Sequence, residues 1–217
     1  MSGLSEQQLT VARTLFALPE AEEYVLAGGS ALAFLGLIDR PTLDLDAFVA
    51  ARPATPPGDV EPLAASLQSR LERDGWSVTV VRRHATFHRL VLTKPGERVE
   101  IDLAVDSPPL FPVETVDGLP VLAPQDLAAR KILAILDRAE GRDYVDLWSL
   151  TKRLDRTDII GWAQRLDAGV GTDQVAEALG QLERLDDADL PCASEAADEV
   201  RHSMADWATE LRARPED

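Results

Sequence analysis

Residues 24–49 read YVLAGGSALAFLGLIDRPTLDLDAFV, and they carry the strongest structural signal in this sequence. Residues 24–27 are apolar and end at two adjacent glycines, which is typical of a short strand followed by a turn. The glycines permit a tight turn because they carry no side chain. The apolar segment 31–38 predicts a short helix with Ser30 as its N-cap. This helix should end before Pro41, since the residue before a proline avoids the helical region.

Two carboxylates follow this helix, two residues apart. Asp44 and Asp46 lie among apolar residues in segment 43–49, which predicts a strand. Residues two apart in a strand point to the same face, so both carboxylates should project together. Like charges on one face repel, and a bound divalent cation would offset that repulsion.

The glycine turn adds a second element to the pattern. Gly28 and Gly29 precede a helix N-terminus, whose unpaired N–H groups suit a phosphate. A glycine pair before a helix is more often an ordinary turn, and an Asp-x-Asp pair is usually a solvated strand face. Their combination is less common, and it favours a site for a phosphate and a metal ion.

Composition and charge exclude several classes of protein. The 217 residues are 45% hydrophobic and 28% charged, ordinary values for a globular chain of one large or two small domains. No apolar run approaches the roughly 20 residues that span a bilayer, and no signal peptide is visible, so we expect a cytoplasmic protein without membrane contact. The single cysteine excludes an internal disulfide and a multi-cysteine zinc site.

The charge distribution bears on any nucleic-acid partner. The formal net charge is −16, which disfavours nucleic-acid binding over most of the surface. Segment 70–98 reverses the sign, with seven basic and three acidic residues and a net charge of +4. Any polyanion should bind there, although a solvated strand and helix face would explain the same charges.

The rest of the chain predicts an α/β part followed by an all-helical part. Lys94-Pro95-Gly96-Glu97 has the length and composition of a hairpin turn. Ser5 and Gln8 resemble a capping box, and Asp59 can cap another helix. We expect strands at 76–83, 86–93, 98–105 and 119–122, and helices at 5–18, 59–75, 125–140, 142–154, 158–166, 172–185 and 193–213.

Gly29-Ser30, thirteen further residues and then Asp44-Leu45-Asp46 resemble the signature of polymerase-β-type nucleotidyltransferases. The fuller pattern, with Gly28 before it and Arg40-Pro41-Thr42-Leu43 inside it, is similar to the AbiEii-type nucleotidyltransferases of bacterial type IV toxin–antitoxin systems. The resemblance implies a polymerase-β-like α/β (α+β) domain with a mixed sheet, which we place at residues 1–118, and an all-helical domain at residues 119–217. We expect the active cleft between these domains.

The resemblance also implies the chemistry. The enzyme would transfer a nucleoside monophosphate from an NTP to an acceptor hydroxyl at a site with two Mg²⁺ ions. The third metal ligand should come from a separate strand, and Asp102 in VEIDLAVD is our candidate, with Glu100 as the alternative. The expected NTP-binding residues are Gly28, Gly29, Ser30 and Lys131, and the expected metal ligands are Asp44, Asp46 and Asp102.

A second group of polar residues lies in the helical part. Lys131, followed by Arg142-Asp143-Tyr144-Val145-Asp146, again resembles AbiEii-type proteins. By this resemblance Lys131 binds phosphate, and Asp143 and Asp146 act in catalysis by positioning it or the acceptor. Asp143 and Asp146 are three apart and therefore share a helix face. The structural alternative is that Lys131 forms a salt bridge with Asp146 that joins two helices. Asp143 could equally be a capping charge at a helix N-terminus.

The resemblance further implies a tRNA 3′ end as acceptor and a toxin restrained by a separately encoded antitoxin. The acidic net charge argues against RNA. A nucleotidyltransferase for a small hydroxylated compound such as an aminoglycoside is one alternative. A non-catalytic interaction module that retains the fold is the other.

Overall fold

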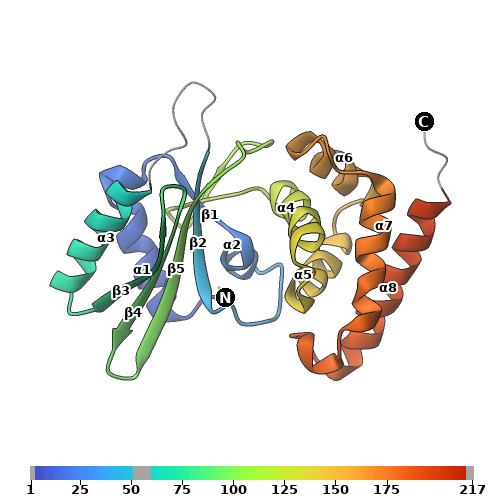
Figure 1. Ribbon diagram of the computed structural model, residues 1–217. Helices are drawn as coiled ribbons and strands as arrows, with labels where there is room; N and C mark the ends of the chain where they lie inside the picture. The colour runs from blue at the N-terminus through green and yellow to red at the C-terminus, as the bar shows by residue number, and fades with distance from the viewer. Residues whose placement is uncertain (1–2, 51–59, 214–217) are drawn as a thin grey trace. The chain divides into compact units, whose positions relative to one another are not determined.

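The computed structural model describes residues 3–50 and 60–213 (Figure 1). The chain divides into two compact units, of which one comprises residues 1–36 and 41–123 and the other residues 37–40 and 124–217. From the sequence we expected the boundary between the two domains after residue 118. The division falls later because strand β7 (Leu119–Val121) pairs with β1 (Tyr24–Ala27) and therefore belongs to the sheet of the first unit.

The first unit is built on a seven-stranded mixed sheet of order β3-β4-β5-β2-β1-β7-β6. The pairs β2–β5 and β1–β7 are parallel, and the other neighbouring pairs are antiparallel. The predicted mixed α/β fold is therefore confirmed. The remaining strands are β2 (Asp44–Ala50), β3 (Ser77–His84), β4 (Phe87–Lys94), β5 (Glu97–Asp106) and β6 (Glu114–Val116).

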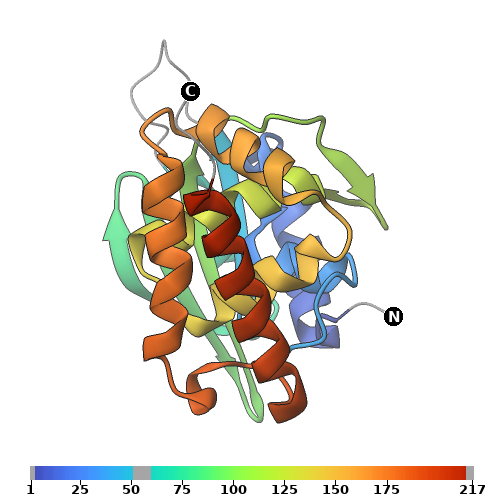
Figure 2. The same cartoon turned by 90° about the vertical axis from the view of Figure 1, so that its right-hand side faces the viewer.

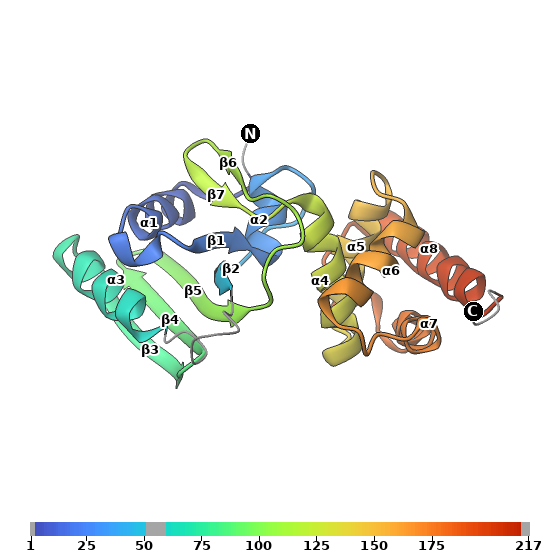
Figure 3. The ribbon, with the colours of Figure 1, turned by 90° about the horizontal axis from the view of Figure 1, so that it is seen from above.

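Helices cover both faces of this sheet. Helices α1 (Glu6–Phe16) and α3 (Glu61–Arg73) lie side by side on one face, and α2 (Gly28–Phe34) lies on the other (Figures 1 and 3). The short 3₁₀ turn η1 (Pro19–Ala21) leads from α1 into β1. The predicted capping box opens α1, since Gln8 N–H donates to Ser5 Oγ at 3.2 Å and Ser5 N–H to Gln8 Oε1 at 2.9 Å. The predicted Asp59 cap of α3 lies outside the described residues.

Two hairpins show what the turn residues specify. The β4–β5 hairpin closes at the pair Lys94–Glu97, as the turn sequence predicts. Only one strand of the β6–β7 hairpin was predicted, at 119–122, and β6 lies in the proline-rich stretch before it. Its turn is Asp117-Gly118, with φ angles of 47° and 81°. Asp-Gly with two positive φ angles is a strong hairpin signal, so the sequence did contain the evidence.

All regular elements in the described residues of the second unit are helices. Figure 2 shows α7 and α8 side by side, and these two helices make the most extensive helix–helix contact of the unit. The predicted helix at 172–185 ends earlier, at Gly180, and continues as a 3₁₀ turn. The elements are α4 (Pro124–Asp137), α5 (Gly141–Thr151), α6 (Arg156–Leu166), α7 (Thr172–Gly180), η2 (Gln181–Arg184), η3 (Asp187–Asp189) and α8 (Ser194–Arg212).

Packing within this unit explains one glycine and one tyrosine. A Cβ at Gly141 would overlap the carbonyl oxygen of Asp189, so the start of α5 requires a glycine. Tyr144 is fully buried and donates from its hydroxyl to the Ala178 carbonyl oxygen at 2.7 Å, which joins α5 to α7. No described helix is both long and apolar enough to cross a membrane.

Candidate active site

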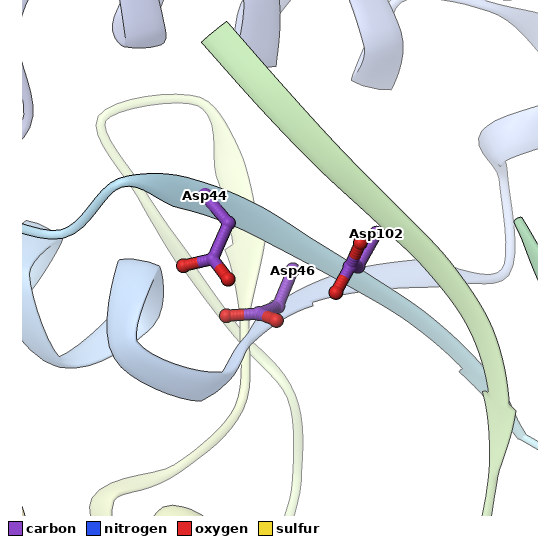
Figure 4. Close-up of side chains that lie close together, drawn as sticks. All are labelled: Asp44, Asp46 and Asp102. Carbon is purple, nitrogen blue, oxygen red and sulfur yellow. The ribbon is translucent and has the colours of Figure 1, made fainter. Parts of the chain in front are cut away.

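Three carboxylates converge on the sheet of the first unit (Figure 4). The parallel register of β2 and β5 places Asp46 opposite Asp102, and alternation along β2 turns Asp44 to the same face. One oxygen from each of Asp44, Asp46 and Asp102 lies within 4.8 Å of the other two. Asp102 is buried, whereas Asp44 and Asp46 are half-buried. Oxygen ligands of this kind suit a hard divalent cation.

Gly28 approaches this cluster closely. Its φ angle is 54°, and an added Cβ would overlap Oδ2 of Asp46 and lie 2.5 Å from its Cγ. Any other residue would therefore face strained backbone and a displaced Asp46 side chain. The first glycine of the pair is thus required by a carboxylate that lies eighteen positions later in the chain.

Ser30 supports the cluster from inside the fold. The side chain is fully buried, its hydroxyl donates to the Ala27 carbonyl oxygen at 2.9 Å, and it accepts from the Asp46 N–H at 2.9 Å. The prediction that Ser30 is the N-cap was wrong, because α2 begins at Gly28 with Ala27 in the N-cap position. The contact with β2 takes the hydroxyl away from the helix N-terminus and fixes the backbone of Asp46.

Thr42 and Gln8 were not predicted to support the site. The Thr42 hydroxyl donates to Oδ1 and to the carbonyl oxygen of Asp44, both at 3.3 Å. The Gln8 amide donates to the Thr42 carbonyl oxygen at 2.9 Å. Both side chains are buried. No local pattern connects residue 8 with residue 42, so only the tertiary structure could reveal this support.

Asp102 also has a charged partner in the neighbouring strand. Arg89 Nε donates to Asp102 Oδ1 at 2.6 Å, and Arg89 Nη2 donates to Oδ2 at 2.5 Å. The hydrogen bonds to Asp102 raise the pKa of Arg89 above its ordinary value, so the guanidinium stays charged. Glu100, the alternative third ligand, is bound by Arg98 at 2.6 Å instead.

These pairs reduce the predicted basic surface of segment 70–98. Arg89 faces the carboxylate cluster, and Arg98 is paired with Glu100. Ion pairs at 3.1 Å and 3.4 Å also join Arg70 to Asp74 and Arg83 to Glu61. The positive sum counted along the sequence is therefore largely balanced by neighbours in the structure.

The second unit contains a buried ion network around Lys131. Its Nζ lies 2.9 Å from Asp143 Oδ1 and 2.7 Å from Asp146 Oδ2, and both aspartates are fully buried. Arg138 donates to Asp143 at 2.9 Å. Arg40 donates to Asp146 through Nε and Nη2, at 2.7 and 2.6 Å. The structure therefore brings the three predicted residues together, and it includes the salt bridge from Lys131 to Asp146 that we gave as the structural alternative.

The network also controls the ionisation of Asp143. Burial by itself would raise the pKa of this carboxyl. The hydrogen bond from Arg138 and the charge of Lys131 outweigh burial and hold the pKa of Asp143 below its ordinary value. Asp143 is thus a buried, charged partner of two cations, which is a different role from the capping charge that its position at a helix start suggested.

Comparison with known proteins identifies the family. The model of the AbiEii nucleotidyl transferase toxin family of type IV toxin–antitoxin systems matches residues 11–213. No curated protein matches the sequence significantly. A Helicobacter pylori protein described as a nucleotidyltransferase has a similar structure, with a TM-score of 0.58 and 18% identity over 96% of both chains. JHP933 from Helicobacter pylori matches with a TM-score of 0.56 and 19% identity, over 96% of this chain and 93% of that one.

At these identities the two structures show the fold alone, and the family match carries the assignment. The predicted family, the polymerase-β-like fold and the nucleotidyltransferase class are confirmed. This chain therefore belongs to the AbiEii family of type IV toxin–antitoxin nucleotidyltransferases.

Proposed function

We propose that the protein transfers a nucleoside monophosphate from an NTP to an acceptor hydroxyl and releases pyrophosphate. The observation that carries this proposal is the convergence of Asp44, Asp46 and Asp102, whose oxygens lie within 4.8 Å of one another. Three carboxylates so close together repel unless cations compensate them. Membership of the AbiEii family supports the same reaction class.

The carboxylates fit the divalent cation that such a reaction requires. Asp44, Asp46 and Asp102 would hold Mg²⁺, since the donors are all oxygens and two of the side chains are half-buried. A pair of Mg²⁺ ions bound there would activate the attacking oxygen and stabilise the leaving one.

The chain itself would bind and orient the substrate. Backbone N–H groups at Gly28, Gly29 and Ser30 are our candidates for triphosphate binding, and Ser30 also holds Asp46 in place through its hydroxyl. We also propose phosphate binding by Lys131. An ammonium has three donors, and the two aspartates of the buried network use two of them.

The acceptor that we propose is a tRNA 3′ end, with an antitoxin encoded by a separate gene as the regulating partner. The family's place in type IV toxin–antitoxin systems supports the antitoxin, and the tRNA acceptor rests on the resemblance of the motifs. The net charge of −16 and the ion pairs in segment 70–98 weaken the case for RNA. For this reason a small hydroxylated compound such as an aminoglycoside remains the second candidate acceptor.

The experiment is transfer of radiolabel from each NTP, with Mg²⁺ present, to total tRNA or to an aminoglycoside. Asp46→Ala should abolish transfer while the protein still folds, because the metal site loses a ligand. Asp74→Ala is the matched control. Asp74 is a surface carboxylate of the same unit, and its exposed side chain forms an ion pair with Arg70. Equal transfer by Asp46→Ala and the wild type would refute the proposal. Labelling of the aminoglycoside alone would identify the second acceptor.

A further inference from the structure

Arg89 is placed within the proposed metal site by the pairing of strands. Arg89 in β4 is the direct cross-strand neighbour of Asp102 in β5. Its guanidinium binds both oxygens of Asp102, at 2.6 and 2.5 Å. Two parallel hydrogen bonds give such a pair a fixed geometry. The Asp102 carboxylate is therefore engaged by a cation before any metal arrives.

The burial of this pair separates it from ordinary surface ion pairs. The Asp102 side chain is 9% exposed and that of Arg89 is 31% exposed. Arg98 and Glu100 form the neighbouring pair, but the Arg98 side chain is 60% exposed and binds one Glu100 oxygen through Nη2, at 2.6 Å. Charges screened by less water interact more strongly, so Arg89 acts on the carboxylate cluster far more than Arg98 does.

The charge of Arg89 extends beyond Asp102. The carboxylates of Asp102, Asp44 and Glu100 all attract the charged guanidinium. The same attraction acts in the other direction, so Arg89 lowers the repulsion among the carboxylates of the metal-free protein. A divalent cation that binds these oxygens must share Asp102 with Arg89 or displace it, and it is repelled by the guanidinium in either case.

We propose that Arg89 is an internal counter-ion of the carboxylate site, which stabilises the metal-free protein and weakens its affinity for a divalent cation. This inference rests on the proposed metal site. Arg89 is accordingly a residue that tunes metal affinity through Asp102, and it need not touch the substrate.

The test is a Mn²⁺ titration by calorimetry, with no nucleotide present, together with melting curves with and without Mn²⁺. Arg89→Met removes the charge and keeps most of the aliphatic stem, and Arg98→Met is the matched control. We expect Arg89→Met to melt at a lower temperature without metal and to bind Mn²⁺ about tenfold more tightly or better. The melting temperature of Arg89→Met should also rise more than that of the wild type at the same Mn²⁺ concentration. Arg98→Met should match the wild type in all three measurements.

Unchanged or weaker Mn²⁺ affinity in Arg89→Met would overturn the inference. If that variant does not fold, Arg89→Gln also removes the charge but keeps an amide donor, and its Mn²⁺ affinity should likewise exceed that of the wild type. Asp46→Ala separates the two proposals. If Asp46→Ala loses the Mn²⁺ binding of the wild type but Arg89→Met keeps the wild-type affinity, only the present inference fails. If neither the wild type nor Arg89→Met binds Mn²⁺, the proposed metal site fails with it.

Discussion

Replacing Gly28 by alanine should damage the carboxylate site more than it damages the fold. Gly28 has a φ angle of 54°, and an added Cβ would overlap Oδ2 of Asp46 and lie 2.5 Å from its Cγ. The alanine must therefore push the Asp46 carboxylate away from its position in the cluster. Gly36→Ala is the matched control, because Gly36 has a φ angle of 65° but no described atom lies within 4 Å of its added Cβ.

The two substitutions share one cost and differ in another. Left-handed backbone costs a non-glycine residue about 1–2 kcal/mol, and the alanine recovers roughly 0.4–1 kcal/mol by restricting the unfolded chain. Gly36→Ala should thus lower the free energy of unfolding by about 1 kcal/mol. Gly28→Ala adds the overlap with Asp46, and forcing extra atoms into a packed site typically costs about 1–3 kcal/mol. Its total loss should be about 2–4 kcal/mol.

Urea unfolding measures these losses of stability. Mn²⁺ titration measures metal binding at the carboxylate site, and the transfer assay measures its activity. Only Gly28→Ala should lose metal binding and transfer. The double variant Gly28→Ala/Asp46→Ala should be more stable than the two single losses imply, because truncating Asp46 removes the Oδ2 and Cγ atoms that the new Cβ meets.

The reasoning would be refuted if Gly28→Ala and Gly36→Ala lost the same stability and both retained full transfer. Additive losses in the double variant would lead to the same conclusion, since they would show no energetic coupling between positions 28 and 46. Either result would mean that the side chain of Asp46 moves aside at little cost.

Two further substitutions test the supports of each unit. Ser30→Ala should lower the free energy of unfolding by about 1–3 kcal/mol, because a partly buried N–H and a buried carbonyl lose their hydroxyl partner. The NTP affinity measured by calorimetry should fall as well, and an unchanged melting temperature would contradict this role. Lys131→Met should cost about 3 kcal/mol in urea unfolding, the low end for breaking a buried pair, because arginines still face both aspartates. The stabilisation from the ionised Asp143 is present above its unfolded pKa of about 3.9, and it is lost as the pH falls through its lowered folded pKa. Lys131→Met should therefore lose stability at a higher pH than the wild type, and identical acid profiles would contradict the assignment.

The local elements of the candidate active site could be predicted because their signals are short-range. A strand and a short helix that follows it can be read from the residues between Tyr24 and Phe34, although the helix begins at Gly28, where a turn was expected. Alternation along one strand is enough to turn Asp44 and Asp46 to the same face. The hairpin before Asp102 follows from its turn sequence. Each inference needs only residues that are close in the chain.

Partners that are distant in the chain could not be predicted in this way. Ser30 has the residue type of a helix cap, but the backbone of Asp46 competes for its hydroxyl, and this contact depends on how β2 lies beside α2. Arg89 contributed to a positive sum along the sequence, whereas strand register pairs it with Asp102. A charge count records sign and number but not the neighbour that neutralises each charge.

The sequence by itself determined the fold class, the family and the residue types of the site, because periodicity, turn chemistry and motif spacing are properties of short segments. Only the tertiary structure decided which of these residues meet. Arg40 and Asp146 are 106 positions apart and still form a bidentate pair. Such contacts depend on sheet register and helix packing, which are set by the burial of many side chains at once, and no local pattern encodes them.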